Sequence, residues 1–214
     1  MHRSLEHVTL PKCHKEGVVN NMSVQIKSRY TLEEYFELER ASEERYEYFN
    51  GEACCMSGVS PNHAQIESNL NLVLRLALRD RGCRVFPANL RVKVPAAPPY
   101  RYPDVVVLCD LPVYEKIGGI ETLTNPTLIV EVLSPSTEAY DRGDKFSYYK
   151  SISGFQEYLL VAQHRPHVTQ FVKQTDAFWR QTEVNDLDGS LHLPSVDCTL
   201  DLNEIYRDIE FNQP

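Results

Sequence analysis

Two apolar segments of the sequence have the composition of strands buried on both faces of a sheet, and each is associated with one acidic residue. Residues 103–108 and 128–133 are rich in β-branched side chains, as is typical of central strands. Asp104 stands near the start of the first segment, and Glu131 lies inside the second. An ionised carboxylate in such a place is costly unless a metal ion or a basic side chain balances it. These two acids are therefore the leading candidates for a functional site.

A lysine follows at a spacing that can complete such a site. Lys145 lies fourteen residues after Glu131, at the start of a predicted helix. A divalent cation such as Mg²⁺ keeps several of its waters, so one or two carboxylates are enough to hold it. A nearby ammonium group can orient an attacking water or stabilise developing negative charge. Brought together at one edge of a sheet, Asp104, Glu131 and Lys145 would suit phosphodiester hydrolysis.

Length and charge limit the class of protein. We predict one domain over residues 23–214 of the 214-residue chain, after a loose polar tail over residues 1–22, with Met22 as an alternative native start. The net charge of −8 argues against a protein that coats nucleic acid without specificity. Local basic clusters are Arg84, Arg91, Lys93 and Arg101, followed by Arg142, Lys145 and Lys150. They fit a basic rim around the site, or ordinary solvated charges at strand edges.

Apolar stretches and cysteines indicate the cellular compartment in which the protein is expected. No apolar stretch reaches the roughly 18–20 residues of a membrane span, and the N-terminal residues do not have the pattern of a secretory signal. The six cysteines show neither a CxxC spacing nor a zinc pattern. We therefore predict reduced thiols and a cytoplasmic protein, with Cys109 as a small buried apolar side chain.

Helical and strand patterns occur in an order typical of an α/β fold. Helices are predicted after the capping box of Thr31 and Glu34 and over residues 62–81 and 144–151. A hairpin over residues 45–56 turns on Asn50-Gly51, and Gly118-Gly119 lies in a loop. Further strands are predicted over residues 84–86, 89–94, 157–161, 168–172, 179–184 and 191–193. We expect a mixed central β-sheet flanked by helices, with an N-terminal helix-hairpin and a C-terminal antiparallel β extension.

The helix predicted over residues 62–81 also carries a polar stripe. His63, Glu67, Asn71 and Arg75 repeat every four residues, so consecutive members lie within one turn of each other. Such a stripe faces solvent in most helices, but it can instead line a cleft.

Several short motifs together indicate a family. They are Pro103-Asp104, Glu131-Val-Leu-Ser-Pro-Ser, Asp141-x-x-x-Lys145-x-x-x-Tyr149 and Gly154-x-x-Glu-Tyr-Leu-Leu-Val161, with the hairpin at residues 46–51, the helix entry Ser60-Pro-Asn-His63 and the closing segment 198–206. In this order and spacing, from about residue 30 to 211, the chain resembles the Uma-two family of bacterial endonucleases. That resemblance implies the restriction-endonuclease-like, PD-(D/E)XK fold.

The resemblance also implies roles for individual residues. Asp104 and Glu131 become the carboxylates that hold Mg²⁺ or Mn²⁺. The superfamily pattern places a lysine two residues after the strand glutamate, but position 133 is a leucine. Lys145 on the following helix takes its place in this interpretation, and Asp141, one turn earlier, either pairs with it or forms a surface pair.

Two further residues match family positions. Glu47, before the hairpin turn, is an additional candidate ligand or an exposed strand glutamate. His63 is a second candidate, or a histidine that makes local hydrogen bonds at the start of a helix.

Three functions fit these observations. The first is a Mg²⁺-dependent endonuclease that hydrolyses DNA phosphodiester bonds, with RNA open as a substrate. The second is a nucleic-acid-binding module of the same fold with weak or lost catalysis, which the net charge and Leu133 favour. The third is a hydrolase of small phosphate compounds. A homodimer is expected if both strands of a duplex are cut, and no membrane partner is expected.

Overall fold

The computed structural model describes residues 29–56, 58–175 and 178–211. The chain divides into two compact units, with the boundary after Ser57, and each is described by itself. The predicted tail over residues 1–22 lies outside the described residues. One domain starting at residue 23 therefore stays a prediction.

The N-terminal unit has the predicted helix and hairpin. Helix α1 (Leu32–Ala41) begins at a capping box, in which Thr31 Oγ1 accepts the N–H of Glu34 at 3.2 Å and Glu34 Oε2 accepts the N–H of Thr31 at 3.0 Å. Strands β1 (Tyr46–Phe49) and β2 (Glu52–Cys55) pair in antiparallel register. Asn50 and Gly51 both have positive φ angles, 48° and 90°, which is the conformation that a two-residue hairpin turn requires.

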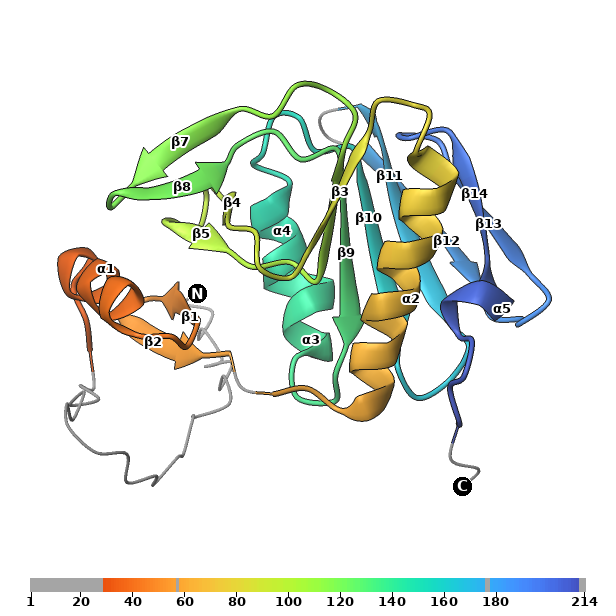
Figure 1. Ribbon diagram of the computed structural model, residues 1–214, viewed down its shortest axis with the longest axis horizontal. Helices are drawn as coiled ribbons and strands as arrows, with labels where there is room; N and C mark the ends of the chain where they lie inside the picture. Colours follow the sequence, from red (N-terminus) through yellow and green to blue (C-terminus); the bar gives the residue numbers. More distant parts are fainter. Residues whose placement is uncertain (1–28, 57, 176–177, 212–214) are drawn as a thin grey trace, which may run out of the picture. The chain divides into compact units, whose positions relative to one another are not determined.

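A six-stranded sheet forms the centre of the second unit, in the order β12-β11-β10-β9-β6-β3 (Figure 1). Its strands are β3 (Arg84–Pro87), β6 (Val105–Leu108), β9 (Leu128–Leu133), β10 (Glu157–Ala162), β11 (Val168–Thr175) and β12 (Phe178–Val184). Strands β9 and β10 are parallel, and the other neighbours are antiparallel. Every residue of β6, β9 and β10 is buried, which explains their nearly continuous apolar sequences.

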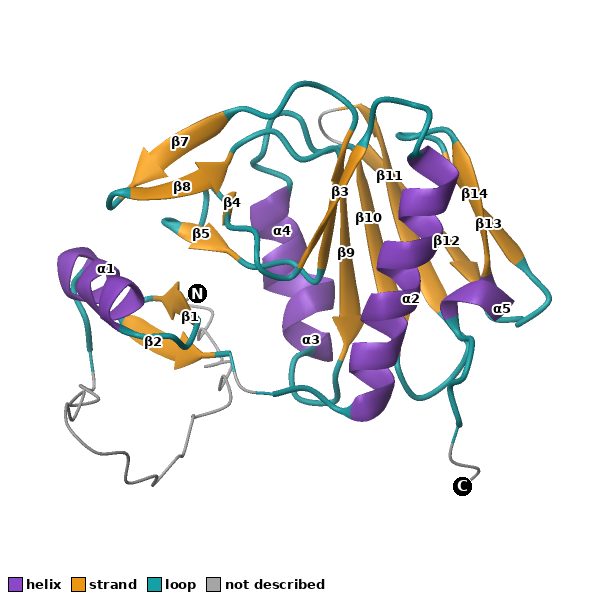
Figure 2. Cartoon of the chain, in the orientation of Figure 1, coloured by secondary structure: helices purple, strands orange, loops and turns teal. Residues whose placement is uncertain are grey.

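Both faces of this sheet are covered (Figure 2). Helix α2 (Pro61–Leu78) packs one side, where its leucine and isoleucine side chains meet Val105, Val107, Val130 and Val132. On the other side, α3 (Glu138–Tyr140), the π-helical turn η1 (Asp141–Lys145) and α4 (Phe146–Tyr149) form one continuous helical segment. Phe146 and Tyr149 pack there with Val106 and Ile129. The predicted mixed α/β architecture is confirmed.

Two smaller sheets complete the unit. Strands β4 (Val92–Lys93), β5 (Tyr100–Arg101), β7 (Tyr114–Ile117) and β8 (Ile120–Leu123) form one of them. Gly118 and Gly119 lie in a turn, within the predicted loop, and this turn joins β7 and β8 into a hairpin. The two strands were not predicted, because β7 is largely exposed and has no apolar alternation.

The C-terminal extension is split. Strands β11 and β12 extend the central sheet as predicted, but β13 (Ser190–Leu193) pairs separately with β14 (Cys198–Asp201), which leads into α5 (Leu202–Ile205). Among the described residues, no helix is long and apolar enough to cross a membrane.

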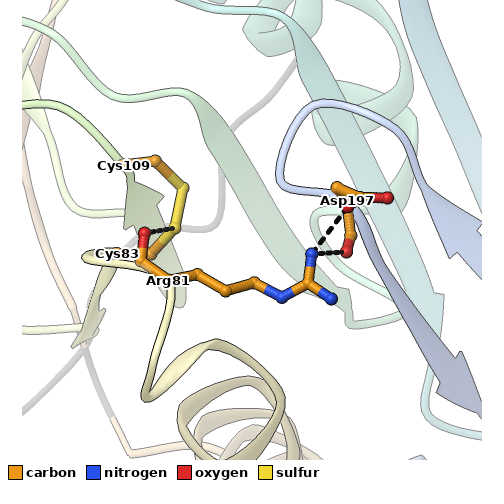
Figure 3. Close-up of a disulfide and its surroundings, with 4 residues drawn as sticks. All are labelled: Arg81, Cys83, Cys109 and Asp197. Carbon is orange, nitrogen blue, oxygen red and sulfur yellow. Dashed lines mark hydrogen bonds and ion pairs between the residues drawn. A yellow bond between two sulfur atoms is a disulfide. The ribbon is translucent and has the colours of Figure 1, made fainter.

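A disulfide corrects the prediction of reduced thiols. Cys83 and Cys109 are bonded (Figure 3). Strands β3 and β6 pair in antiparallel register with Arg84 opposite Leu108, so continuing the register by one residue places the two cysteines opposite each other. Cys109 is thus not a simple buried apolar side chain. In the same loop, Arg81 Nη1 lies 2.7 Å from Asp197 Oδ2 and links the end of α2 to the β13–β14 turn.

Candidate active site

Glu131 is a buried acid on the central strand β9. Its neighbours Val130 and Val132 belong to the core on the α2 side, whereas Ile129 and Leu133 belong to the core on the α4 side. Because side chains alternate along a strand, Glu131 faces the α3–η1–α4 segment. Only 3% of its surface is exposed, so the energetic problem raised by the sequence is present in the structure.

Lys145 balances this charge. Its Nζ lies 2.8 Å from Glu131 Oε1 and 3.1 Å from Asp141 Oδ1. The hydroxyl of Tyr149 donates a 2.8 Å hydrogen bond to the same Glu131 oxygen. Asp141, Lys145 and Tyr149 follow one another at four-residue steps, and the π-helical turn η1 contains the first two. Such turns are frequent at functional sites. The Asp141–Lys145 pair is buried, not a surface pair.

The buried carboxylates affect one another. Burial raises the pKa of Glu131 well above its ordinary value; Lys145 opposes this shift, while the charges of Asp104 and Asp141 add to it. Burial and the charge of Glu131 also raise the pKa of Tyr158, whose hydroxyl donates to the Asp141 carbonyl oxygen at 3.1 Å. The carboxylates of Asp104 and Glu131 therefore act on each other electrostatically.

Asp104 lies at the start of β6, beside Glu131. Val105 pairs with Val130, and extension of this antiparallel register places residue 104 opposite residue 131. The backbone N–H of Val132 donates a 2.7 Å hydrogen bond to Asp104 Oδ2. The aspartate is thus held against the strand that carries Glu131.

A second group of side chains meets Asp104 from helix α2. His63 Nε2 lies 3.5 Å from Asp104 Oδ2, and one ligand atom each from His63, Glu67 and Asp104 lie within 4.8 Å of one another. His63 is 5% exposed, and within the described part of the chain neither of its ring nitrogens has a hydrogen-bond partner. Buried polar atoms are normally satisfied. An imidazole nitrogen near two carboxylates fits a divalent metal ligand set.

Sequence reasoning named Asp104, Glu131, Lys145 and His63, and the structure places all four at this end of the central sheet. Sequence reasoning did not select Glu67. The signal was present in the stripe at His63, Glu67, Asn71 and Arg75, but a stripe of this spacing does not tell a cleft from a solvent-facing surface.

Glu47 belongs to the other compact unit of the chain. It lies on β1 of the N-terminal unit, opposite Cys54 in the hairpin. Its role as a ligand stays a prediction.

Comparisons with known proteins agree with this architecture. A family model described as "Putative restriction endonuclease" (Uma2) matches residues 32–203. Two uncharacterized proteins of the cyanobacterium Synechocystis are similar: sll1609 is 35% identical over 72% of this chain and 86% of its own length, and slr1290 is 36% identical over 84% and 92%.

A solved structure shares the fold. It is described as a "putative nuclease belonging to DUF820" from Anabaena variabilis, with a TM-score of 0.65 and 21% sequence identity over 83% of this chain and 97% of that one. The restriction-endonuclease-like fold expected from the sequence motifs is confirmed. With a family model that covers most of the chain, and relatives above 30% identity, this protein belongs to the Uma2 (Uma-two) family.

Proposed function

We propose that this protein is a metal-dependent endonuclease that hydrolyses phosphodiester bonds of DNA. The observation that carries the proposal is the meeting of two groups at one end of β6 and β9. One group offers ligand atoms from His63, Glu67 and Asp104, and the other is the buried Glu131–Lys145 pair. Membership of a family described as restriction endonucleases supports the same reaction class.

The residues present fit a divalent cation. Asp104 and Glu131 are the carboxylates that would hold it, and Glu67 and His63 are further ligands within reach of Asp104. A cation bound here would lower the pKa of a water and neutralise negative charge on the phosphate. Mg²⁺ takes oxygen ligands almost exclusively, whereas an imidazole suits transition metals. Participation of His63 would therefore favour Mn²⁺ over Mg²⁺.

Lys145 and Tyr149 organise the second carboxylate. Both contact Glu131 Oε1, so they fix the orientation of this carboxylate on β9. The Lys145 ammonium can also stabilise the negative charge that the phosphate gains as water attacks. Lys145 would therefore have the role of a lysine at position 133, although it lies on the following helical segment and not on β9.

One observation favours the nucleic-acid-binding module as an alternative. Lys145 and Tyr149 both occupy Glu131 Oε1, and a carboxylate held in this way is less available to a metal. In that case the protein would bind DNA without cutting it.

Plasmid cleavage tests the proposal. The full chain is incubated with supercoiled plasmid in Mn²⁺, in Mg²⁺ and in EDTA, beside Asp104→Asn and Glu131→Gln. We expect nicked or linear DNA only with metal, and loss of cleavage in both variants. Cleavage that persists in EDTA, or in both variants, would overturn the assignment. Binding without cleavage would favour the alternative, and a parallel RNA substrate distinguishes the two nucleic acids.

Three further predictions accompany the proposal. A homodimer would present two sites to a duplex, and light scattering of the full chain measures this. We also expect no membrane partner. A cytoplasmic location stays an expectation from the sequence, but reduced thiols no longer support it, because Cys83 and Cys109 are bonded.

A further inference from the structure

A cavity lies at the end of α2 far from the candidate active site. It has a volume of about 370 Å³ and lies between the last turn of α2 and the edge strand β3. Its apolar lining includes Leu78, Phe86 and Pro87, and its charged lining consists of Arg75, Arg79 and Arg84. Among the described residues, no carboxylate lines the cavity, although the chain as a whole has a net charge of −8.

The three arginines are exposed and carry uncompensated charge. Within the part of the chain that the structure describes, none of their side chains forms a hydrogen bond or an ion pair. Arg81, in the same loop, is instead paired with Asp197. A cavity lined by three arginines and by no carboxylate attracts an anion. Arginine offers planar, forked donors that match the oxygens of a phosphate.

Helix α2 connects this cavity with the candidate active site. The four-residue spacing that begins with His63 and Glu67 continues to Arg75 and Arg79, but each step turns by about 40°, so it leads from the buried His63 to exposed arginines. At 1.5 Å per residue, His63 and Arg75 are about 18 Å apart along the helix axis, and His63 and Arg79 about 24 Å. Strand β3 runs beside the helix, with Pro87 paired to Val105 next to Asp104 and Arg84 paired to Leu108 at the far end (Figure 1).

The separation along α2 can be expressed as a length of duplex. Along the duplex axis, at 3.4 Å per base pair, about 18–24 Å corresponds to about five to seven base pairs. We propose that the cavity lined by Arg75, Arg79 and Arg84 binds a backbone phosphate of DNA about five to seven base pairs from the phosphate at the metal site. The exposed Pro87 at the rim of the cavity would contact the adjoining sugar. The inference rests on the proposed function, because it takes DNA as the substrate.

Equilibrium binding tests it without cleavage. The Kd of the full chain for a fluorescent duplex of about 20 base pairs, longer than the predicted span, is measured in EDTA over a series of salt concentrations. Arg75→Ala, Arg79→Ala and Arg84→Ala are compared singly and combined. Arg180→Ala is the matched control, because Arg180 is exposed on β12, the opposite edge of the central sheet.

We expect each single variant to raise Kd about threefold to tenfold. The combined variant should also reduce the slope of log Kd against log salt by about 0.9 for each phosphate that it no longer neutralises. The control should leave both quantities unchanged. A combined variant that binds like Arg180→Ala, or a wild-type chain that does not bind the duplex, overturns the proposal. Inorganic phosphate or a mononucleotide that binds as tightly as the duplex would also overturn it, in favour of a small-phosphate site.

Cleavage measured alongside separates the two proposals. If DNA binds through the arginines but is never cut, the cavity assignment stands and the nuclease assignment fails. If the combined variant binds and cuts DNA as the wild type does, the nuclease assignment stands and the cavity assignment fails.

Discussion

Asp104 Oδ2 accepts the backbone N–H of Val132 at 2.7 Å, which attaches the acid at the start of β6 to the strand that carries Glu131. The hydrogen bond fixes the position of the carboxylate, and the repulsion between the two acids helps to raise the pKa of Glu131. The arrangement therefore costs stability in the metal-free chain. A pair of this kind is expected where a cation binds.

The first prediction separates the hydrogen bond of Asp104 from its charge by substitution at position 104. Asp104→Asn keeps an oxygen that can accept from Val132 but removes the charge. We expect Mn²⁺ affinity, measured by calorimetry, to fall at least about 10-fold. The free energy of unfolding in EDTA should stay the same or increase, because the repulsion is gone. Asp104→Ala also removes the hydrogen bond, so its free energy of unfolding should be about 1 kcal/mol lower than that of Asp104→Asn. Unchanged Mn²⁺ affinity in Asp104→Asn would remove Asp104 from the ligand set.

The second prediction concerns the buried ion pair. Lys145→Met leaves Glu131 and Asp141 without their shared cation, and we expect a loss of about 3–5 kcal/mol in the free energy of unfolding, measured in urea. Adding Glu131→Gln to this variant should restore part of the loss, because the uncompensated charge is then absent. Lys116→Met is the control, since Lys116 is exposed on β7, and should change stability by less than about 0.5 kcal/mol. If Lys145→Met and the double variant lose the same free energy of unfolding, the uncompensated charge of Glu131 is not the cause of the loss.

The sequence was informative where chemistry conflicts with local structure. Asp104 and Glu131 could be found because an acid is conspicuous in an apolar strand. Lys145 could be found because its spacing and motif follow those acids. Glu67 could not be chosen from its helix, because a stripe at four-residue steps looks the same in a cleft and on a solvent-facing surface.

The pairing of strands that are distant in the sequence could not be predicted either. The Cys83–Cys109 disulfide depends on the register of β3 against β6, and no local pattern near either cysteine encodes that register. For the same reason, the sequence places the strand predicted at residues 191–193 in one extension with β11 and β12, whereas its actual partner is β14.

A third prediction follows from a buried acid outside the candidate site. Burial raises the pKa of Glu157 above its ordinary value of 4.5, although hydrogen bonds from Gln170 (2.5 Å) and the Ser195 N–H (3.1 Å) oppose the shift. The folded chain therefore favours the protonated carboxyl. Its contribution to stability is complete below the unfolded pKa and is lost as pH rises through the raised folded pKa.

Glu157→Gln does not ionise and removes this dependence. Urea unfolding from pH 4 upward, on both proteins, should show the variant gaining stability relative to the wild type as pH rises above 4.5. Glu121→Gln, at an exposed position on β8, is the control. A difference between Glu157→Gln and the wild type that is constant with pH would show that Glu157 ionises equally in the folded and unfolded chains.

The last prediction concerns the disulfide between β3 and β6. It closes a loop with a sequence separation of 26 residues, and a loop of this size is expected to contribute about 3.5 kcal/mol by restricting the unfolded chain. Cys83→Ala/Cys109→Ala should therefore lower the free energy of unfolding by about that amount without reductant. Dithiothreitol should lower the wild type toward the same value and leave the variant unchanged. The single variant Cys198→Ala, at a cysteine outside the disulfide, should respond to dithiothreitol as the wild type does. If dithiothreitol leaves wild-type stability unchanged, the disulfide does not stabilise the sheet edge.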